Sequence, residues 1–378
     1  MSSSVSMWLL FGASILLAYI SDQKSICEKN EYGEKEYIRK EKVIYFFMSI
    51  LLCLFVGLRL WCNDTGTYRD LYEYLTPGSG NIFSDISWKV GDSPAFMIFN
   101  RILKHLGAST QTFLMVYSII TNGLYLWFIR RYSANTTLSV FLFWTMGVYL
   151  FSAAGMRQAI AIAIGLIGVN CYLEKKWFGF FFWIILAMFF HPYAVLFIIA
   201  PFMTYEPWTK KTWAIIAIFL VIGLGLNSLI DIIFKLTAFM GKTYKEDSFS
   251  GEGVNIFRLL VIWTPILLSF FARKFTAKSK DKVNNLFMNF SIINATIMFV
   301  ALFGTANYFA RLANYFLIFQ TLALPWMIKF FNTQSRKVLK MGIVCCYLLY
   351  FIFAYVILTP FNSYFAKITL LEYIKSLF

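Results

Sequence analysis

The sequence has few charged residues, and this scarcity already limits the class of protein. Only 14% of its 378 residues are Asp, Glu, Lys or Arg, whereas soluble domains have about 25%. So little polar surface cannot cover a soluble core of this size. Apolar residues make up 59% of the chain, which excludes intrinsic disorder. The composition therefore predicts an all-α, polytopic integral membrane protein.

Common catalytic and metal-binding motifs are missing from the sequence. It contains no GxGxxG, GxxxxGK[ST], HExxH, GxSxG or CxxC element. Of the six cysteines, only Cys62 falls near the predicted outer face, so we expect no disulfide there. We therefore expect neither a metal site nor a cofactor.

Acidic residues are scarce relative to basic ones. The 34 Lys and Arg against 19 Asp and Glu give a net charge of +15. Nucleic acid is not the expected partner, because basic residues also collect in the cytoplasmic loops of membrane proteins. Twenty-one of them lie in segments that we place in the cytoplasm, namely 22–42, 130–131, 175–176, 210–211, 273–282 and 329–340.

Long apolar runs are abundant, and each span needs about 20 residues. The runs cover residues 5–21, 43–58, 112–129, 137–153, 158–173, 177–203, 212–230, 254–272, 286–303, 307–328 and 341–359. We expect a single transmembrane domain, 1–378, with about twelve spans and both termini outside.

The run at 177–203 lies between two basic segments that we both place in the cytoplasm. It must therefore cross the membrane twice, or enter the membrane and return to the same side. His191-Pro192 lies near its middle, and a proline disfavours helix at the residue before it. We predict a broken hairpin with arms 177–190 and 193–203, each too short to span upright. Broken helices are tolerated where they line protein or a cavity.

Two long segments, 60–110 and 231–253, are expected on the extracytoplasmic side, where long loops are often functional. Within the first, residues 94–106 are amphipathic and suit a helix lying at the membrane interface.

Four arginines oppose the charge rule because they fall at the outer ends of spans. An intramembrane Arg costs at least about 2.5 kcal/mol, so it usually has a partner or a function. These residues are Arg59, Arg157, Arg258 and Arg311. They bind an anion, snorkel to the interface or pair with an acidic residue.

Arg157 and Arg311 are the best candidates for an anion site. Arg157 opens its span, near the positive end of a helix dipole. Asn307, Arg311 and Asn314 have i, i+4, i+7 spacing and share one helix face. Two guanidinium groups from different helices suit pyrophosphate, because each planar fork binds two oxygens.

Other polar residues suit acid–base chemistry or sugar contacts. His191 is either a base or hydrogen-bond donor, or a satisfied interior histidine. Asp64 either positions or deprotonates a sugar hydroxyl, or pairs with Arg59. Tyr68 and Tyr315 are candidates for stacking on sugars.

Five short motifs, in order, resemble the EpsG/Wzy family of bacterial polysaccharide polymerases. They are GLRLWCNDTGTYRDLYEY from Gly57, DSPAFMIFNRIL from Asp92, AGMRQAIAIAI from Ala154, FFHPYAVLF from Phe189 and ARLANYF from Ala310. Ser93 and Tyr193 depart from the family's usual pattern.

The resemblance implies a glycosyltransferase that joins oligosaccharide repeat units linked to undecaprenyl pyrophosphate. It acts at the outer face of the bacterial plasma membrane, for O-antigen, capsule or exopolysaccharide, beside membrane lipid, a flippase and a chain-length regulator. The expected catalytic residues are Arg157, Arg311, His191 and Asp64. The expected substrate-binding residues are Arg59, Arg258, Tyr68, Asn307, Asn314 and Tyr315.

Alternative functions remain open. A lipid-linked oligosaccharide flippase or transporter would also place Arg inside the bundle, but its two halves should show repeat symmetry, and we see none. An O-antigen ligase uses the same donor and differs in its acceptor. A membrane acyltransferase would depend on a histidine such as His191.

Overall fold

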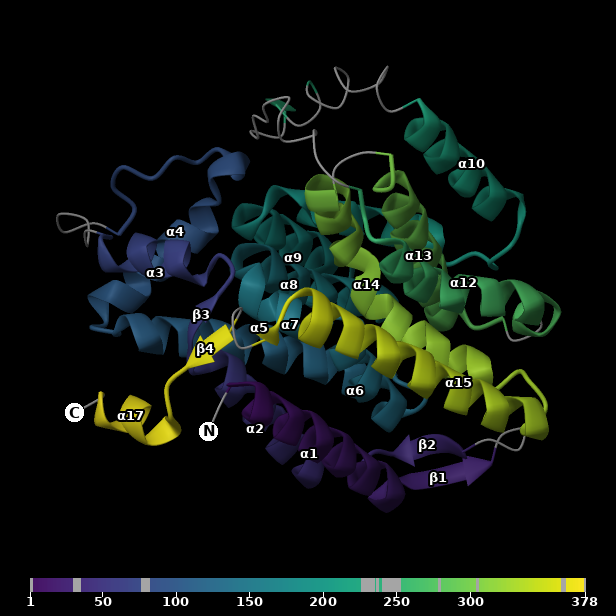
Figure 1. The fold of residues 1–378 in the computed structure, drawn as a ribbon. Coiled ribbons are helices and arrows are strands. Elements are labelled where there is room, and N and C mark those ends of the chain that lie inside the picture. Colours follow the sequence, from purple (N-terminus) through teal and green to yellow (C-terminus); the bar gives the residue numbers. More distant parts are fainter. Residues whose placement is uncertain are drawn as a thin grey trace.

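Helices make up most of the fold (Figure 1). The computed structural model describes residues 3–29, 35–75, 82–225, 235, 238–239, 253–277, 280–303, 306–361 and 365–376. The first half comprises α1 (Ser3–Lys24), β1 (Ile26–Lys29), β2 (Lys35–Arg39), α2 (Val43–Gly57), β3 (Arg59–Cys62), α3 (Thr65–Glu73), η1 (Val90–Asp92), α4 (Pro94–His105), α5 (Thr110–Tyr132), α6 (Thr136–Thr145), α7 (Val148–Ala154) and α8 (Met156–Leu173). The second half comprises α9 (Trp177–Phe190), η2 (Pro192–Met203), α10 (Lys210–Leu224), α12 (Ile256–Thr276), α13 (Lys282–Val300), α14 (Ala306–Ile328), α15 (Thr333–Ile352), η5 (Phe353–Leu358), β4 (Phe365–Lys367) and α17 (Leu370–Lys375).

The protein is an all-α membrane protein. Within the described residues, six helices are long and apolar enough to cross a membrane, or seven if the bent pair α6–α7 counts as one span. The helices α2, α9 and η2 are apolar but shorter. The expected number of about twelve spans therefore stays a prediction, as do the single domain and the orientation.

The chain breaks at His191 as the sequence predicts. Helix α9 ends at Phe190, and His191 is extended, with φ −156° and ψ 122°. The second arm is a 3₁₀-helix, η2, rather than an α-helix. At about 1.5 Å and 2.0 Å per residue, the two arms are about 21 Å and 24 Å long, less than the roughly 30 Å hydrocarbon core. The path of the hairpin through the bilayer stays a prediction.

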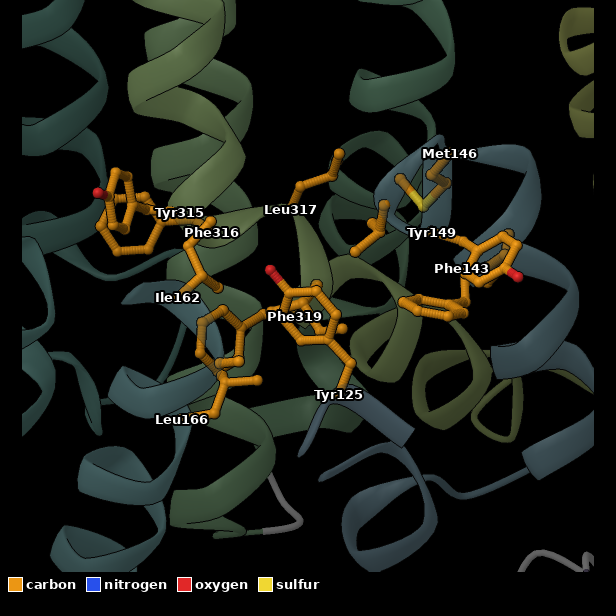
Figure 2. Close-up of a cluster of buried hydrophobic side chains, with 14 of the residues drawn as sticks. Tyr125, Phe143, Met146, Tyr149, Ile162, Leu166, Tyr315, Phe316, Leu317 and Phe319 are labelled. Carbon is orange, nitrogen blue, oxygen red and sulfur yellow. The ribbon is translucent and has the colours of Figure 1, made fainter. Parts of the chain in front are cut away.

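Small residues on α8 allow its neighbours to pack closely. A Cβ at Gly165 would collide with Phe197 of η2, and one at Gly168 would lie 2.8 Å from Ile184 of α9. Figure 2 shows the interior beside it, where Ile162 and Leu166 of α8 lie near Phe319 of α14. The broken hairpin is thus anchored on α8 and α14, which form the centre of the bundle.

A kink separates α6 from α7, and the sequence analysis did not predict it. The two helices are bent by 47°. Gly147, at the kink, has φ +80°, which glycine adopts without a steric penalty. A Cβ there would collide with the hydroxyl of Tyr355 in η5, so the kink and this π-helix pack directly together.

Segments placed in the cytoplasm contact one another: Lys40 Nζ donates to the carbonyl of Ser133 at 2.7 Å, and Arg131 pairs with Glu174. The predicted amphipathic helix is present as α4. The expected loop at 231–253 lies almost entirely outside the described residues.

Two short sheets were not predicted. Strands β1 and β2 pair antiparallel, and β3 pairs antiparallel with β4 near the end of the chain (Figure 1). Trp61 faces Ala366 and Cys62 faces Phe365 in the second sheet. It ties the segment that precedes Asp64 to the C-terminal region.

Candidate functional site

A cavity of about 540 Å³ brings together most of the predicted site residues. They come from the start of α3, the start of α8, the break after α9, and the helices α12 and α14. The predicted residues that line it are Asp64, Tyr68, Arg157, His191, Arg258, Arg311 and Asn314. Segments more than 250 residues apart in the sequence therefore meet in one space.

Arg157 lies in the first turn of α8, directly after the break at Gly155. Its guanidinium carbon lies 5.7 Å from the ring centres of both Tyr68 and Phe96. Contact with aromatic faces favours a cation and holds it in place. The sequence predicted Arg157 at a helix N-terminus, but it did not indicate this aromatic support from α3 and α4.

Arg311 faces Asp64 across the cavity. Its Nη2 atom lies 4.0 Å from Asp64 Oδ2, and the two side chains are 55% and 41% exposed. Such an exposed, long pair is weak, so a ligand can compete for either partner. Asp64 therefore pairs with Arg311 and not with Arg59, the partner considered from the sequence.

Gln158 is a lining residue that the sequence analysis did not select. Its side-chain amide donates to the backbone carbonyl of Arg311, which fixes the first turn of α8 against α14. Its place directly after Arg157 in the Met-Arg-Gln element was the available signal. The hydrogen bond links the helix turn that carries Arg157 to the helix that carries Arg311.

Arg258 enters the cavity from α12. Its Nη2 atom lies 3.4 Å from the side-chain oxygen of Asn314, three residues after Arg311 on α14. Three guanidinium groups thus line the cavity, against one carboxylate, Asp64, among the lining residues that the structure describes. This excess of positive charge suits an anionic ligand.

His191 lines the cavity and is held in place by Tyr315. The Tyr315 hydroxyl lies 2.6 Å from His191 Nδ1. Tyr315 is fully buried and does not line the cavity, so direct binding of substrate by Tyr315 is not supported. His191 therefore lines the cavity with its ring held by a buried tyrosine.

Arg59 does not belong to the cavity lining. It is 1% exposed, and it donates to Thr65 Oγ1 at 3.1 Å, to the Val56 carbonyl at 2.8 Å and to Met156 Sδ at 3.3 Å. The expected contact with substrate is therefore corrected: Arg59 turns inward because it finds hydrogen-bond partners there. It joins the end of α2 and the start of α3 to the residue before Arg157.

The side chain of Asn307 lies outside the described residues. In the described part of the chain, no three His, Cys, Asp or Glu residues gather in a way that could hold a metal ion.

The sequence profile of the EpsG family matches residues 42–373. The chain belongs to the EpsG family. EpsG proteins are polysaccharide polymerases of the Wzy type. The match contains every cavity-lining segment, from Asn63 to Thr359. No curated protein and no solved structure matches the chain significantly.

Proposed function

We propose that this EpsG protein is a glycosyltransferase that joins oligosaccharide repeat units carried on undecaprenyl pyrophosphate. It acts at the outer face of the bacterial plasma membrane and makes O-antigen, capsule or exopolysaccharide. The observation that supports this function is the convergence of three guanidinium groups, a carboxylate and an imidazole in one cavity. A flippase and a chain-length regulator of the same pathway are its proposed partners.

Arg157 and Arg311 bind the pyrophosphate of the donor, and Arg258 adds charge beside them. During transfer, the bond between the anomeric carbon and the pyrophosphate oxygen breaks, and negative charge develops on that oxygen. Fixed cations lower the barrier because they stabilise this charge as it forms. The Gln158 hydrogen bond to the Arg311 carbonyl links the two helices that carry the principal arginines.

Asp64 is the proposed base on the acceptor side. It accepts the proton of the sugar hydroxyl as that oxygen forms its bond to the anomeric carbon. His191 is less suited to this role, because its Nδ1 atom is already engaged by the Tyr315 hydroxyl at 2.6 Å. His191 lines the same cavity and contacts the leaving group there.

Replacement of single arginines tests the donor site. Arg157→Ala and Arg311→Ala should each slow polymerisation about 30-fold to 1000-fold, the scale of losing one oxyanion donor. Arg157→Lys should recover little, because the two-pronged contact is lost. Polymer length on gels, at matched protein level, measures the effect.

Arg131→Ala is the matched control. Arg131 is also a partly exposed arginine with an acidic partner, Glu174, but it lies outside the cavity. Long chains from both cavity variants would refute the pyrophosphate assignment. Failure of single lipid-linked units to reach the outer face would favour the flippase, and transfer to a different acceptor would favour the ligase.

A further inference from the structure

The cavity has an apolar wall in addition to its charged residues. This wall comes mainly from the kinked pair α6–α7 and from α15 with its π-helical end, η5. Its apolar members include Met146, Leu150, Phe151, Phe353 and Leu358. A pyrophosphate gains nothing from contact with this surface, whereas an apolar group is stabilised when it is buried there.

The apolar wall reaches the outer surface of the protein at η5. Leu358 lines the cavity and is also 59% exposed. The preceding residues, Val356 and Ile357, are exposed as well, at 39% and 66%. Exposed apolar side chains next to α15, a candidate span, contact lipid in a membrane protein. The cavity edge at Leu358 is therefore where the cavity meets the surrounding lipid.

The irregular backbone at this edge is built into the packing. A π-helix is rare and is often found at functional sites. It begins at Phe353, which lines the cavity, and its Tyr355 packs on Gly147 at the α6–α7 kink. The kink and the π-helix thus form one continuous wall between the charged residues and the outer surface.

We propose that this wall binds the first isoprene units of the donor lipid, whose chain then leaves the cavity into the bilayer past Leu358. The inference rests on the proposed function. A donor with its pyrophosphate on the arginines has to place the attached apolar chain on an apolar surface. The wall formed by α6–α7 and η5 provides that surface and continues to the exposed side chain of Leu358.

Two donors that share the same oligosaccharide and pyrophosphate test the inference on the full-length protein. One carries undecaprenyl, and the other ends in a methyl group and has no lipid to bind. Leu358→Asp should raise the KM for the undecaprenyl donor about tenfold more than it raises the KM for the methyl donor. Leu358→Ala should act in the same direction with a smaller change, without adding charge.

Ile357→Asp is the matched control. Ile357 is adjacent and more exposed, but it does not line the cavity, so the ratio of the two KM values should stay at the wild-type level. Equal changes for both donors in the Leu358 variants, or equal changes in the Ile357 and Leu358 variants, would overturn the inference. Wild-type protein that transfers from neither donor would overturn the proposed function itself.

Discussion

Tyr315 does not line the cavity, but its hydroxyl contacts His191, which does line it. Tyr315→Phe removes only the hydroxyl that lies 2.6 Å from Nδ1. Because one hydrogen bond is worth about 1 kcal/mol, we expect kcat to fall roughly fivefold to tenfold. The pH profile of kcat should also shift, since the imidazole loses the hydroxyl that contacts its Nδ1 atom.

Tyr125→Phe is the control for that change. Tyr125 is equally buried, and its hydroxyl donates to the Ala159 carbonyl at 3.1 Å, away from the cavity. Loss of packing alone would lower protein stability in both variants and leave both pH profiles unchanged. A normal profile for Tyr315→Phe would contradict the positioning role.

An isosteric substitution can distinguish the role of Asp64 from that of a neighbouring carboxylate, Asp70. Asp64→Asn should abolish chain growth and leave donor binding measurable, because the amide cannot take a proton from the acceptor hydroxyl. Asp70→Asn, an exposed position on α3 that does not line the cavity, should be silent. Chain growth by Asp64→Asn at the wild-type rate would exclude Asp64 as the base.

Arg59 and Arg157 illustrate how far residue-level prediction reaches. Both were selected because each arginine opposes the charge rule, but only Arg157 lines the cavity. Arg59 is buried by contacts with Thr65 and Met156, and the second of these lies 97 positions away in the sequence. Charge patterning shows that such an arginine has a role, but it cannot show which way the side chain turns.

Substitution of Arg59 should accordingly lower stability, whereas substitution of Arg157 should not. Arg59→Ala removes three hydrogen bonds inside the protein, so the free energy of unfolding should fall by about 2–4 kcal/mol. Arg157→Ala should leave the thermal midpoint in detergent close to that of the wild type. A lower midpoint for Arg157→Ala and an unchanged one for Arg59→Ala would reverse the two assignments.

At the scale of elements, the sequence predicts a helix break where a proline follows. It does not predict a kink that depends on a glycine packed against a residue far away in the sequence. The break after Phe190 follows from His191-Pro192. The kink at Gly147 depends on Tyr355, which is remote in sequence, and the strand pair β3–β4 depends on residues at both ends of the chain. Local patterns cannot reveal contacts of this kind.

The kink can be tested by a pair of substitutions. Gly147→Ala places a Cβ at φ +80° and against the Tyr355 hydroxyl, so it should destabilise the protein by more than the roughly 1–2 kcal/mol of a left-handed residue alone. Tyr355→Phe should recover part of that loss. A double-mutant cycle on thermal stability measures the coupling, and strict additivity would show that the two positions are independent.

At the scale of the whole molecule, β4 and Ile368 connect the C-terminal region to residues 58–62, which follow α2. The Ile368 amide donates to the Leu58 carbonyl at 2.9 Å, beside the pairing of β3 with β4. A chain that ends at Phe361 should lose polymer synthesis, because Asp64 loses the strand that supports its neighbours. A chain that ends at Thr369 keeps β4 and should retain most of its activity, and equal activity of the two would show that β4 is dispensable.

This closure also sets an order of events during synthesis on the ribosome. Residues 59–62 leave the ribosome about three hundred residues before their partners at 365–367. Contacts between such distant segments form late in folding. A nascent chain can therefore insert most of its helices while the strand beside Asp64 is still unpaired, so the support of Asp64 is among the last contacts of the fold to form.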